Sequence, residues 1–184
     1  MLFFLYKNIY YFNRQDSILY ESDLEGERFK ELSVLPKSFK GMPKGLRLSE
    51  DKEKILLFNS HQICVLYLSP KGSLLYGQNS LMLDYPGKKI IQVFWHSDSY
   101  HLILVTDKNI SVLETNILSN ELSLVNLNGF PSELFYDIDR DSLYFSDYQM
   151  GNDGAVYENV YKLEFSEKAS IISSVVKLRQ NERE

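Results

Sequence analysis

The sequence has few of the features that mark disulfide-bonded, membrane-spanning or nucleic-acid-binding proteins. Its single cysteine, Cys64, excludes a disulfide within the chain. No apolar run approaches the roughly 20 residues that a membrane-spanning helix needs. The formal net charge is −5, and lysine and arginine are dispersed, which argues against nucleic acid and against an anionic membrane surface. We therefore expect no nucleic-acid partner and no membrane insertion.

Aromatic residues are the main surplus of the sequence. They make up 14% of the chain, with 13 tyrosines and 11 phenylalanines against one tryptophan, and tyrosine and phenylalanine favour strands. A chain of 184 residues with 44% hydrophobic content can bury the core of one domain, which we place at 1–184. Cys64 lies in the apolar run 63–68, so we expect a buried, inert thiol.

The apolar start of the chain, residues 1–12, could be mistaken for a signal peptide. It lacks a basic beginning and a small-residue cleavage site, and Lys7 and Asn8 interrupt it. A strand hairpin accounts for it better. We expect no signal peptide in the chain as given, and the compartment is unknown.

Three segments can be laid over one another: 46–58, 93–105 and 134–146. In each, an apolar residue is followed by Asp at +3 and by an apolar strand from +7, so Asp51, Asp98 and Asp139 coincide. Tight hairpin turns also recur at 7–9, 61–63 and 108–110. A repeat of this length is typical of stacked supersecondary units that bury their faces against their neighbours.

The middle unit predicts four antiparallel strands, graded from buried to exposed: 90–95, 101–106, 110–114 and 121–127. Four such strands describe one β-propeller blade. The second unit predicts strands at 44–49, 54–59, 62–68 and 80–84, and the last at 132–136, 142–148, 157–165 and 170–178.

The start of the chain matches the second, third and fourth strands of a blade, at 1–6, 9–12 and 17–21, with 23–35 as a loop. We therefore predict an all-β chain of about four blades, the first lacking its innermost strand. The units are approximately 1–35, 44–85, 90–128 and 132–178.

Residues 94–102 resemble the strand, turn and strand of bacterial WD-repeat-like and TolB-like β-propellers. Residues 54–63, and 141–147 with 160–164, resemble blades of bacterial surface propellers, including those attached to PEGA domains. The Trp-Asp pair of many WD repeats and the Ser-x-Asp-x-Gly box of sialidase-like propellers are missing. Such propellers usually have about six to eight blades, so the resemblance implies about half of one. It also implies a binding platform, often outside the cytoplasm.

Two local patterns are candidate binding sites. Asp137, Asp139 and Asp141 alternate as Ca²⁺ ligands can, but the helix-loop-helix pattern is absent and a solvated turn is the commoner explanation. The insertion 147–154 interrupts the last unit, and loops at propeller rims often bind ligands. Its candidate binding residues are listed here: Tyr148, Gln149, Asn152 and Asp153.

No catalytic residue, cofactor or metal site is predicted. The three histidines, His61, His96 and His101, lack the i, i+4 spacing of a helical metal pair. Phosphate-binding loops and nucleophile elbows are also missing from the sequence.

An incomplete ring would leave apolar faces and a strand edge uncovered, and such edges aggregate unless another chain covers them. We therefore expect a homo-oligomer, or the remainder of a longer chain, to close the ring; a closed four-bladed ring is the competing arrangement. The leading functional hypothesis is a non-enzymatic scaffold that binds a protein, peptide or glycan. The alternative is a carbohydrate-active hydrolase or lyase using carboxylates in the propeller funnel. The predicted first strands favour the scaffold, because their main polar residues are Arg47, Gln92 and Glu133.

Overall fold

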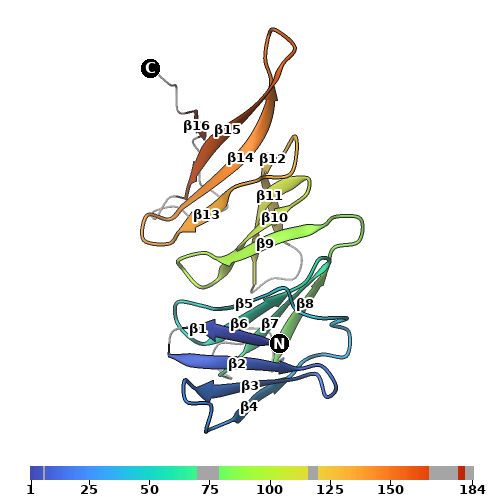
Figure 1. The fold of residues 1–184 in the computed structure, drawn as a ribbon, viewed down its shortest axis with the longest axis vertical. Coiled ribbons are helices and arrows are strands. Elements are labelled where there is room, and N and C mark those ends of the chain that lie inside the picture. Colours follow the sequence, from blue (N-terminus) through green and yellow to red (C-terminus); the bar gives the residue numbers. More distant parts are fainter. Residues whose placement is uncertain (6, 70–78, 116–119, 166–177, 181–184) are drawn as a thin grey trace. The chain divides into compact units, whose positions relative to one another are not determined.

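The computed structural model describes residues 1–5, 7–69, 79–115, 120–165 and 178–180 (Figure 1). These residues form strands, turns and loops, and none of them lies in a helix that could cross a membrane. The strands are β1 (Leu2–Leu5), β2 (Asn8–Asn13), β3 (Ile18–Asp23), β4 (Lys30–Val34), β5 (Gly45–Leu48), β6 (Lys54–Phe58), β7 (Gln62–Tyr67), β8 (Ser80–Asp84), β9 (Ile90–Trp95), β10 (His101–Thr106), β11 (Asn109–Glu114), β12 (Glu121–Asn126), β13 (Leu134–Asp137), β14 (Ser142–Met150), β15 (Val156–Glu164) and β16 (Leu178–Gln180).

The strands form four sheets of four, and in each sheet the strands lie in chain order. Consecutive strands such as β1 and β2, β5 and β6, and β10 and β11 pair antiparallel, which is the meander expected of a propeller blade. The prediction of all-β, four-stranded blades is confirmed. In the middle unit the observed strands agree with the predicted ones to within one residue.

The first sheet differs from its prediction. It has a fourth strand, β4, where we expected a loop, so β1 opens a complete four-stranded sheet and the blade lacks no strand. The strand escaped detection because it is a short edge strand: Lys30 and Glu31 are exposed, and Leu32 is its contact with the apolar core. Such an edge carries little hydrophobic alternation.

The repeated hairpins share their register. Leu48 pairs with Ile55 and Tyr136 with Leu143, each seven residues apart, as the overlay predicts. The turns of the first two hairpins match closely, since Lys52 and Ser99 adopt positive φ values of 59° and 61°. In the third hairpin the positive φ falls one place later, at Asp141, with 48°.

The shared turn aspartate is confirmed in two units and wrong in the third. Asp51 Oδ1 accepts the Glu53 N–H at 3.0 Å, and Asp98 Oδ1 accepts the Tyr100 N–H at 2.8 Å. Asp139 is exposed, and Asp137 instead accepts an N–H in that turn. The shifted turn explains the change, because it moves the backbone donors relative to position 139.

The strands fall into two compact units, which we describe separately. In the first unit, β1–β4 and β5–β8 enclose an apolar core that includes Phe12, Leu19, Leu57 and Cys64. Cys64 is fully buried, and burial raises the pKa of its thiol to about 12, as expected for an inert thiol. In the second unit, β9–β12 and β13–β16 enclose a core built from the side chains listed here: Phe94, Ile103, Val105, Ile110, Leu143, Phe145 and Leu163.

The predicted strand 170–178 lies, apart from Leu178, outside the described residues. The strand β16 begins at Leu178 and pairs with β15 at Tyr161, Lys162 and Leu163.

Candidate functional site

The hairpin of β14 and β15 extends well beyond the rest of its sheet (Figure 1). β13 pairs with β14 only over 142–145, and the described part of β16 pairs with β15 only over 161–163. Among the described residues, 146–150 and 156–160 therefore continue as a two-stranded ribbon. A projecting ribbon of this kind offers a contact surface supported by a rigid sheet.

The base of this ribbon is fixed by a buried carboxylate. Asp147 is 5% exposed, and its Oδ1 accepts the backbone N–H groups of Asn128 and Gly129 at 2.9 and 3.2 Å. The ring of Tyr148 packs so closely on Gly129 that a Cβ there would lie 2.5 Å from it. A larger residue at 129 would have to displace the Tyr148 ring, and the contact anchors the ribbon at its root.

The predicted insertion is more regular than expected. Tyr148 and Gln149 belong to β14, and only 151–155 is turn and loop, where Asn152 and Asp153 are exposed. Asp153 accepts the Ala155 N–H at 3.0 Å and the Tyr157 hydroxyl at 2.6 Å, and these bonds lower the pKa of its carboxyl. Tyr148 is half-buried and belongs to the anchor, whereas Gln149, Asn152 and Asp153 are exposed.

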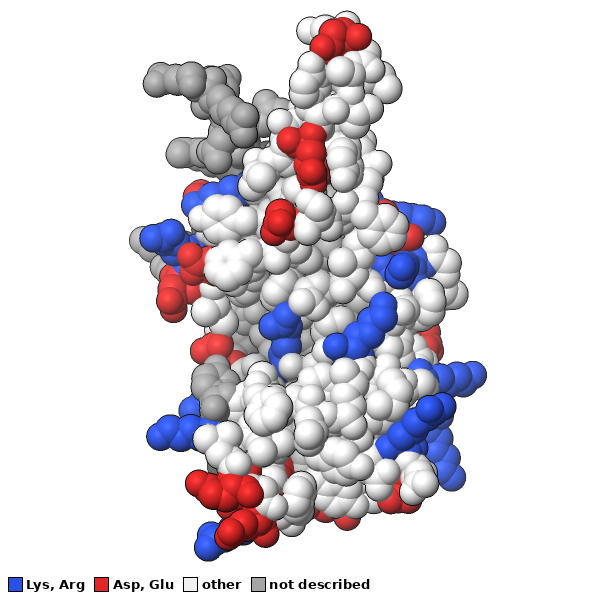
Figure 2. Space-filling view, viewed as in Figure 1, with Lys and Arg blue, Asp and Glu red and all other residues white. Residues whose placement is uncertain are grey.

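The end of the ribbon is both apolar and acidic. Met150 is 72% exposed and Val156 is 64% exposed, and the two pair across the end of the ribbon. The exposed charged residues of the ribbon are Asp153 and Glu158, it has no basic residue, and Figure 2 shows acidic side chains on it. This tip suits a partner segment that combines apolar and basic side chains.

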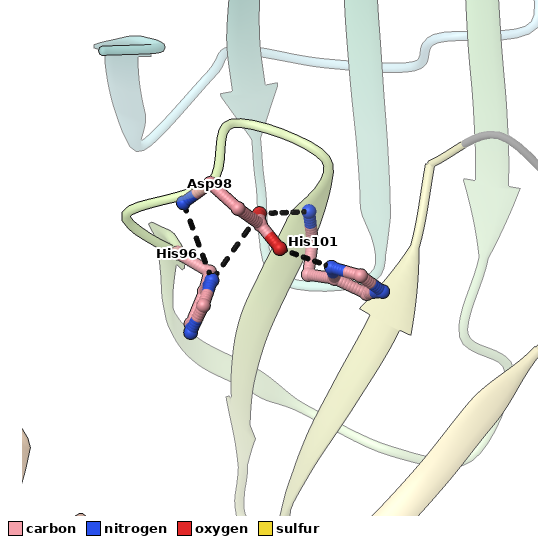
Figure 3. A group of neighbouring side chains, drawn as sticks. All are labelled: His96, Asp98 and His101. Atoms are coloured by element: carbon pink, nitrogen blue, oxygen red, sulfur yellow. Dashed lines mark hydrogen bonds and ion pairs between the residues drawn. The ribbon is translucent and has the colours of Figure 1, made fainter. Parts of the chain in front are cut away.

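A second polar cluster lies in the turn between β9 and β10 (Figure 3). His101 Nδ1 lies 2.6 Å from Asp98 Oδ2, and His96 Nδ1 lies 3.2 Å from Asp98 Oδ1. The Asp98 backbone N–H also points at His96 Nδ1, at 3.3 Å. The hairpin brings them together because its register pairs His96 with His101 through a backbone bond of 2.9 Å.

A buried carboxylate stands behind this cluster. His96 Nε2 lies 3.0 Å from Asp141 Oδ2, a close ion pair that is not aligned as a hydrogen bond, and the other oxygen of Asp141 accepts the Tyr136 hydroxyl. His96 is 6% exposed and Asp141 5%. Burial lowers the pKa of His96, but Asp141 and Asp98 outweigh burial and raise it to about 9. Burial of Tyr136 itself and its hydrogen bond to Asp141 raise the pKa of the Tyr136 hydroxyl well above its usual range.

Asp98 is shifted in the opposite direction. Partial burial would raise its pKa, but the imidazoles of His101 and His96 and the Tyr100 N–H hold it well below its usual range. The carboxylate is therefore ionised throughout the neutral range. The cluster combines an ionised carboxylate with two imidazole nitrogens, a donor set that metal ions accept.

Sequence reasoning did not connect these residues. The i, i+4 spacing expected of two metal-binding histidines applies to a helix, whereas His96 and His101 face each other across a β-turn. Asp141 was grouped with Asp137 and Asp139, but those three carboxylates do not converge: Asp141 is buried and Asp139 is exposed. The His96–Asp141 contact joins residues 45 apart that no local pattern connects. His61 lies elsewhere and faces the Lys88 carbonyl at 3.0 Å.

Comparison with known proteins identifies the fold and no family. No family model matches the chain, and no curated protein matches it. Among solved structures, it is similar to the Cps50 (Swd1) β-propeller domain of Myceliophteria thermophila, with 10% identity, TM-score 0.56, and coverage of 95% of this chain and 55% of that one. It is also similar to a chain of the yeast heterotrimeric Nup82–Nup159–Nup116 nucleoporin complex, with 15% identity, TM-score 0.55, and coverage of 86% and 40%.

A third similar structure is a Bacteroides fragilis protein with a suggested 6-phosphogluconolactonase activity, at 15% identity and TM-score 0.53, covering 96% of this chain and 55% of that one. At these identities the likeness describes the fold alone. The four four-stranded sheets are β-propeller blades, and the chain spans about half the length of the structures that it matches.

Proposed function

We propose that this chain is a non-enzymatic, protein-binding β-propeller module that closes its ring of blades against a second copy of itself. The observation that carries the proposal is the apolar outer face of β1–β4. A blade buries both faces of its sheet against its neighbours. One face of this sheet, with Tyr10, Phe12 and Leu19, packs into the core of the first unit.

The opposite face of the sheet is rich in exposed apolar side chains. Leu2 is 56% exposed and Phe4 is 68% exposed, on the strand that opens the sheet. Next to them Tyr11 and Tyr20 stack with their ring centroids 6.3 Å apart. An open groove of about 510 Å³ runs over this face, lined by Leu2, Tyr11, Asn13, Tyr20 and Phe29. Apolar surface of this extent usually marks a contact with another protein.

Three further observations support the proposal. The chain spans 40–55% of the structures that it resembles, which leaves room for further blades. One of those structures is a heterotrimeric complex. The four opening strands, β1, β5, β9 and β13, carry one carboxylate, Asp137, where a funnel hydrolase would need at least two.

The finer parts of the proposal follow from the resemblance and from the ribbon. Membership of bacterial surface propellers of the PEGA-attached kind would place the module outside the cytoplasm. The ribbon tip, acidic and apolar, would present the binding surface to a basic segment of a partner protein.

Light scattering coupled to gel filtration tests ring closure. We expect the 184-residue chain to have twice the 21.5 kDa mass of one copy, because the outer face of β1–β4 is covered in the dimer. Phe4→Glu should yield a folded monomer. Lys37→Gln, an exposed loop change with the same effect on net charge, should leave the dimer intact.

A monomeric wild-type chain that binds no dye specific for exposed apolar surface would contradict the proposal. So would a dimer that Phe4→Glu does not weaken, because the contact would then lie on another surface.

A further inference from the structure

We propose that His96, Asp98 and His101 bind a divalent transition-metal ion, with Zn²⁺ as the test ion. One ligand atom from each of these residues lies within 4.8 Å of the others, and all three come from the turn between β9 and β10 (Figure 3). Two imidazoles and a carboxylate are ligands that Zn²⁺ accepts, and three protein ligands leave a coordination position open. The inference does not depend on the function proposed above.

Of the distances between ligand atoms, the one from His96 to Asp98 is close to what a metal requires. With bonds of about 2.0–2.2 Å, ligand atoms around a tetrahedral Zn²⁺ lie about 3.3 Å apart. His96 Nδ1 and Asp98 Oδ1 are 3.2 Å apart. His101 Nδ1 is 2.6 Å from Asp98 Oδ2, a hydrogen-bond distance, so this pair must open by several tenths of an ångström as the metal replaces the proton. A partly exposed turn permits that movement.

The groups behind the cluster are those that a metal-binding histidine needs. A ligating imidazole almost always presents its second nitrogen to a carboxylate or carbonyl, which sets the tautomer and orients the ring. Here Asp141 Oδ2 lies 3.0 Å from His96 Nε2. Asp141 is in turn held by the Tyr136 hydroxyl, and both Asp141 and His96 are more than nine-tenths buried. With Asp141 beside Nε2, Nδ1 is the nitrogen of His96 that faces Asp98 and would bind the metal.

Charge also favours a cation at this position. Asp98 and Asp141 bring two negative charges to the cluster, one of them buried. A buried carboxylate is costly unless positive charge lies close to it. A protonated His96 would supply one positive charge beside them, whereas a divalent ion would supply two, one for each carboxylate.

The equivalent hairpin of the preceding blade, between β5 and β6, provides an internal comparison. There Ser49, Asp51 and Lys54 occupy the places of His96, Asp98 and His101, with the same backbone bond across the turn, at 3.0 Å. Lys54 Nζ pairs with Asp51 Oδ2 at 2.5 Å, so that turn carries its own cation. In the β9–β10 turn, His96 and His101 therefore lie at the positions that Ser49 and Lys54 occupy in the β5–β6 turn.

The competing explanation is that a protonated His96 does what Lys54 does, and that the turn binds no metal. Titration of the chelator-treated, dialysed chain with ZnCl₂ in a calorimeter at pH 7.5 separates the two. We expect one Zn²⁺ per chain, with proton release that changes the heat between buffers of different ionisation enthalpy.

Three variants make the test specific. His101→Lys copies the first unit, keeps a cation beside Asp98, and should abolish binding while the chain stays folded. Asp141→Asn tolerates the positive φ of that position, and should weaken binding about 10–100-fold through loss of the group behind His96. His61→Gln, which removes the histidine outside the cluster, should leave binding unchanged.

The proposal is overturned if the wild-type chain takes up no Zn²⁺. It is also overturned if His101→Lys, folded by circular dichroism, binds as well as wild type, or if His61→Gln removes the binding. In each of these cases the cluster serves only to pair charges in the turn.

Discussion

Replacing Gly45 by alanine tests the register of the β5–β6 pair, on which the blade assignment depends. Gly45 lies opposite Phe58 in this pair, and Phe58 is 2% exposed. A Cβ at position 45 would lie 2.3 Å from Cε1 and 2.5 Å from Cζ of the Phe58 ring. Contacts this short do not persist, so either the ring or the strand must move.

Two effects of opposite sign decide the outcome. Alanine in a strand restricts the unfolded chain more than glycine does, which would stabilise the protein by about 0.5–1 kcal/mol. Displacing a ring from a packed core costs about 1–3 kcal/mol. We therefore expect Gly45→Ala to lower the free energy of unfolding by about 1 kcal/mol, within the range of about 0–2.5 kcal/mol that the difference between these terms spans.

Urea unfolding followed by tryptophan fluorescence and circular dichroism measures this cost. The Phe58→Leu variant should cost about 1 kcal/mol by itself, since the shorter side chain fills the site less well. In the double variant the smaller leucine relieves the clash with the alanine side chain at position 45. The double variant should therefore lose at least about 0.5 kcal/mol less stability than the sum of the losses in the two single variants, a coupling typical of residues in contact. A stabilised Gly45→Ala chain, or strictly additive costs, would show that the ring does not lie over position 45.

Two further predictions concern single side chains. Cys64 should not react with a thiol reagent at pH 8 until urea unfolds the chain, because burial raises its pKa to about 12; rapid labelling of the native chain would show that β7 is not in the core. Hydrogen bonds from Lys54 and Ser49 outweigh burial and lower the pKa of Asp51 below its ordinary value of 3.8, so its contribution to stability is present above that pH and lost as pH falls. The stability difference between wild type and Asp51→Asn should therefore shrink from pH 6 to pH 2, and a difference independent of pH would contradict the assignment.

The blades could be predicted from the sequence because their signals are local. Strand alternation, tight turns and a repeated aspartate depend on residues close in the chain, and the hairpin registers followed from the offsets. Where a strand lacks such a signal the prediction failed: β4 is a mostly exposed edge, and the two prolines that follow it made its region resemble a loop. The pairing partner of an edge strand is decided by the sheet and not by the strand's own residues.

The polar clusters were harder to predict because they depend on contacts across sheets. His96 and His101 could have been paired from the hairpin register alone, had a β-turn been considered in place of a helix. Asp141 could not, because its approach to His96 requires two blades of the second unit to pack. Asp147 is similar, since its hydrogen bonds to Asn128 and Gly129 exist only once the loop before β13 closes over β14.

The three repeated turns show how one backbone feature can serve different purposes. Asp51 is paired with an ammonium, Asp98 is enclosed by two imidazoles, and in the third turn Asp139 is exposed while Asp137 accepts the backbone bond. The fold requires of these turns only that a carboxylate satisfy backbone donors, a demand that any of these arrangements meets. The residues that flank the aspartate are therefore free to vary without loss of the blade. In a repeat protein, new chemistry can arise at such positions, because the strands on either side already hold two side chains at a fixed separation across the turn.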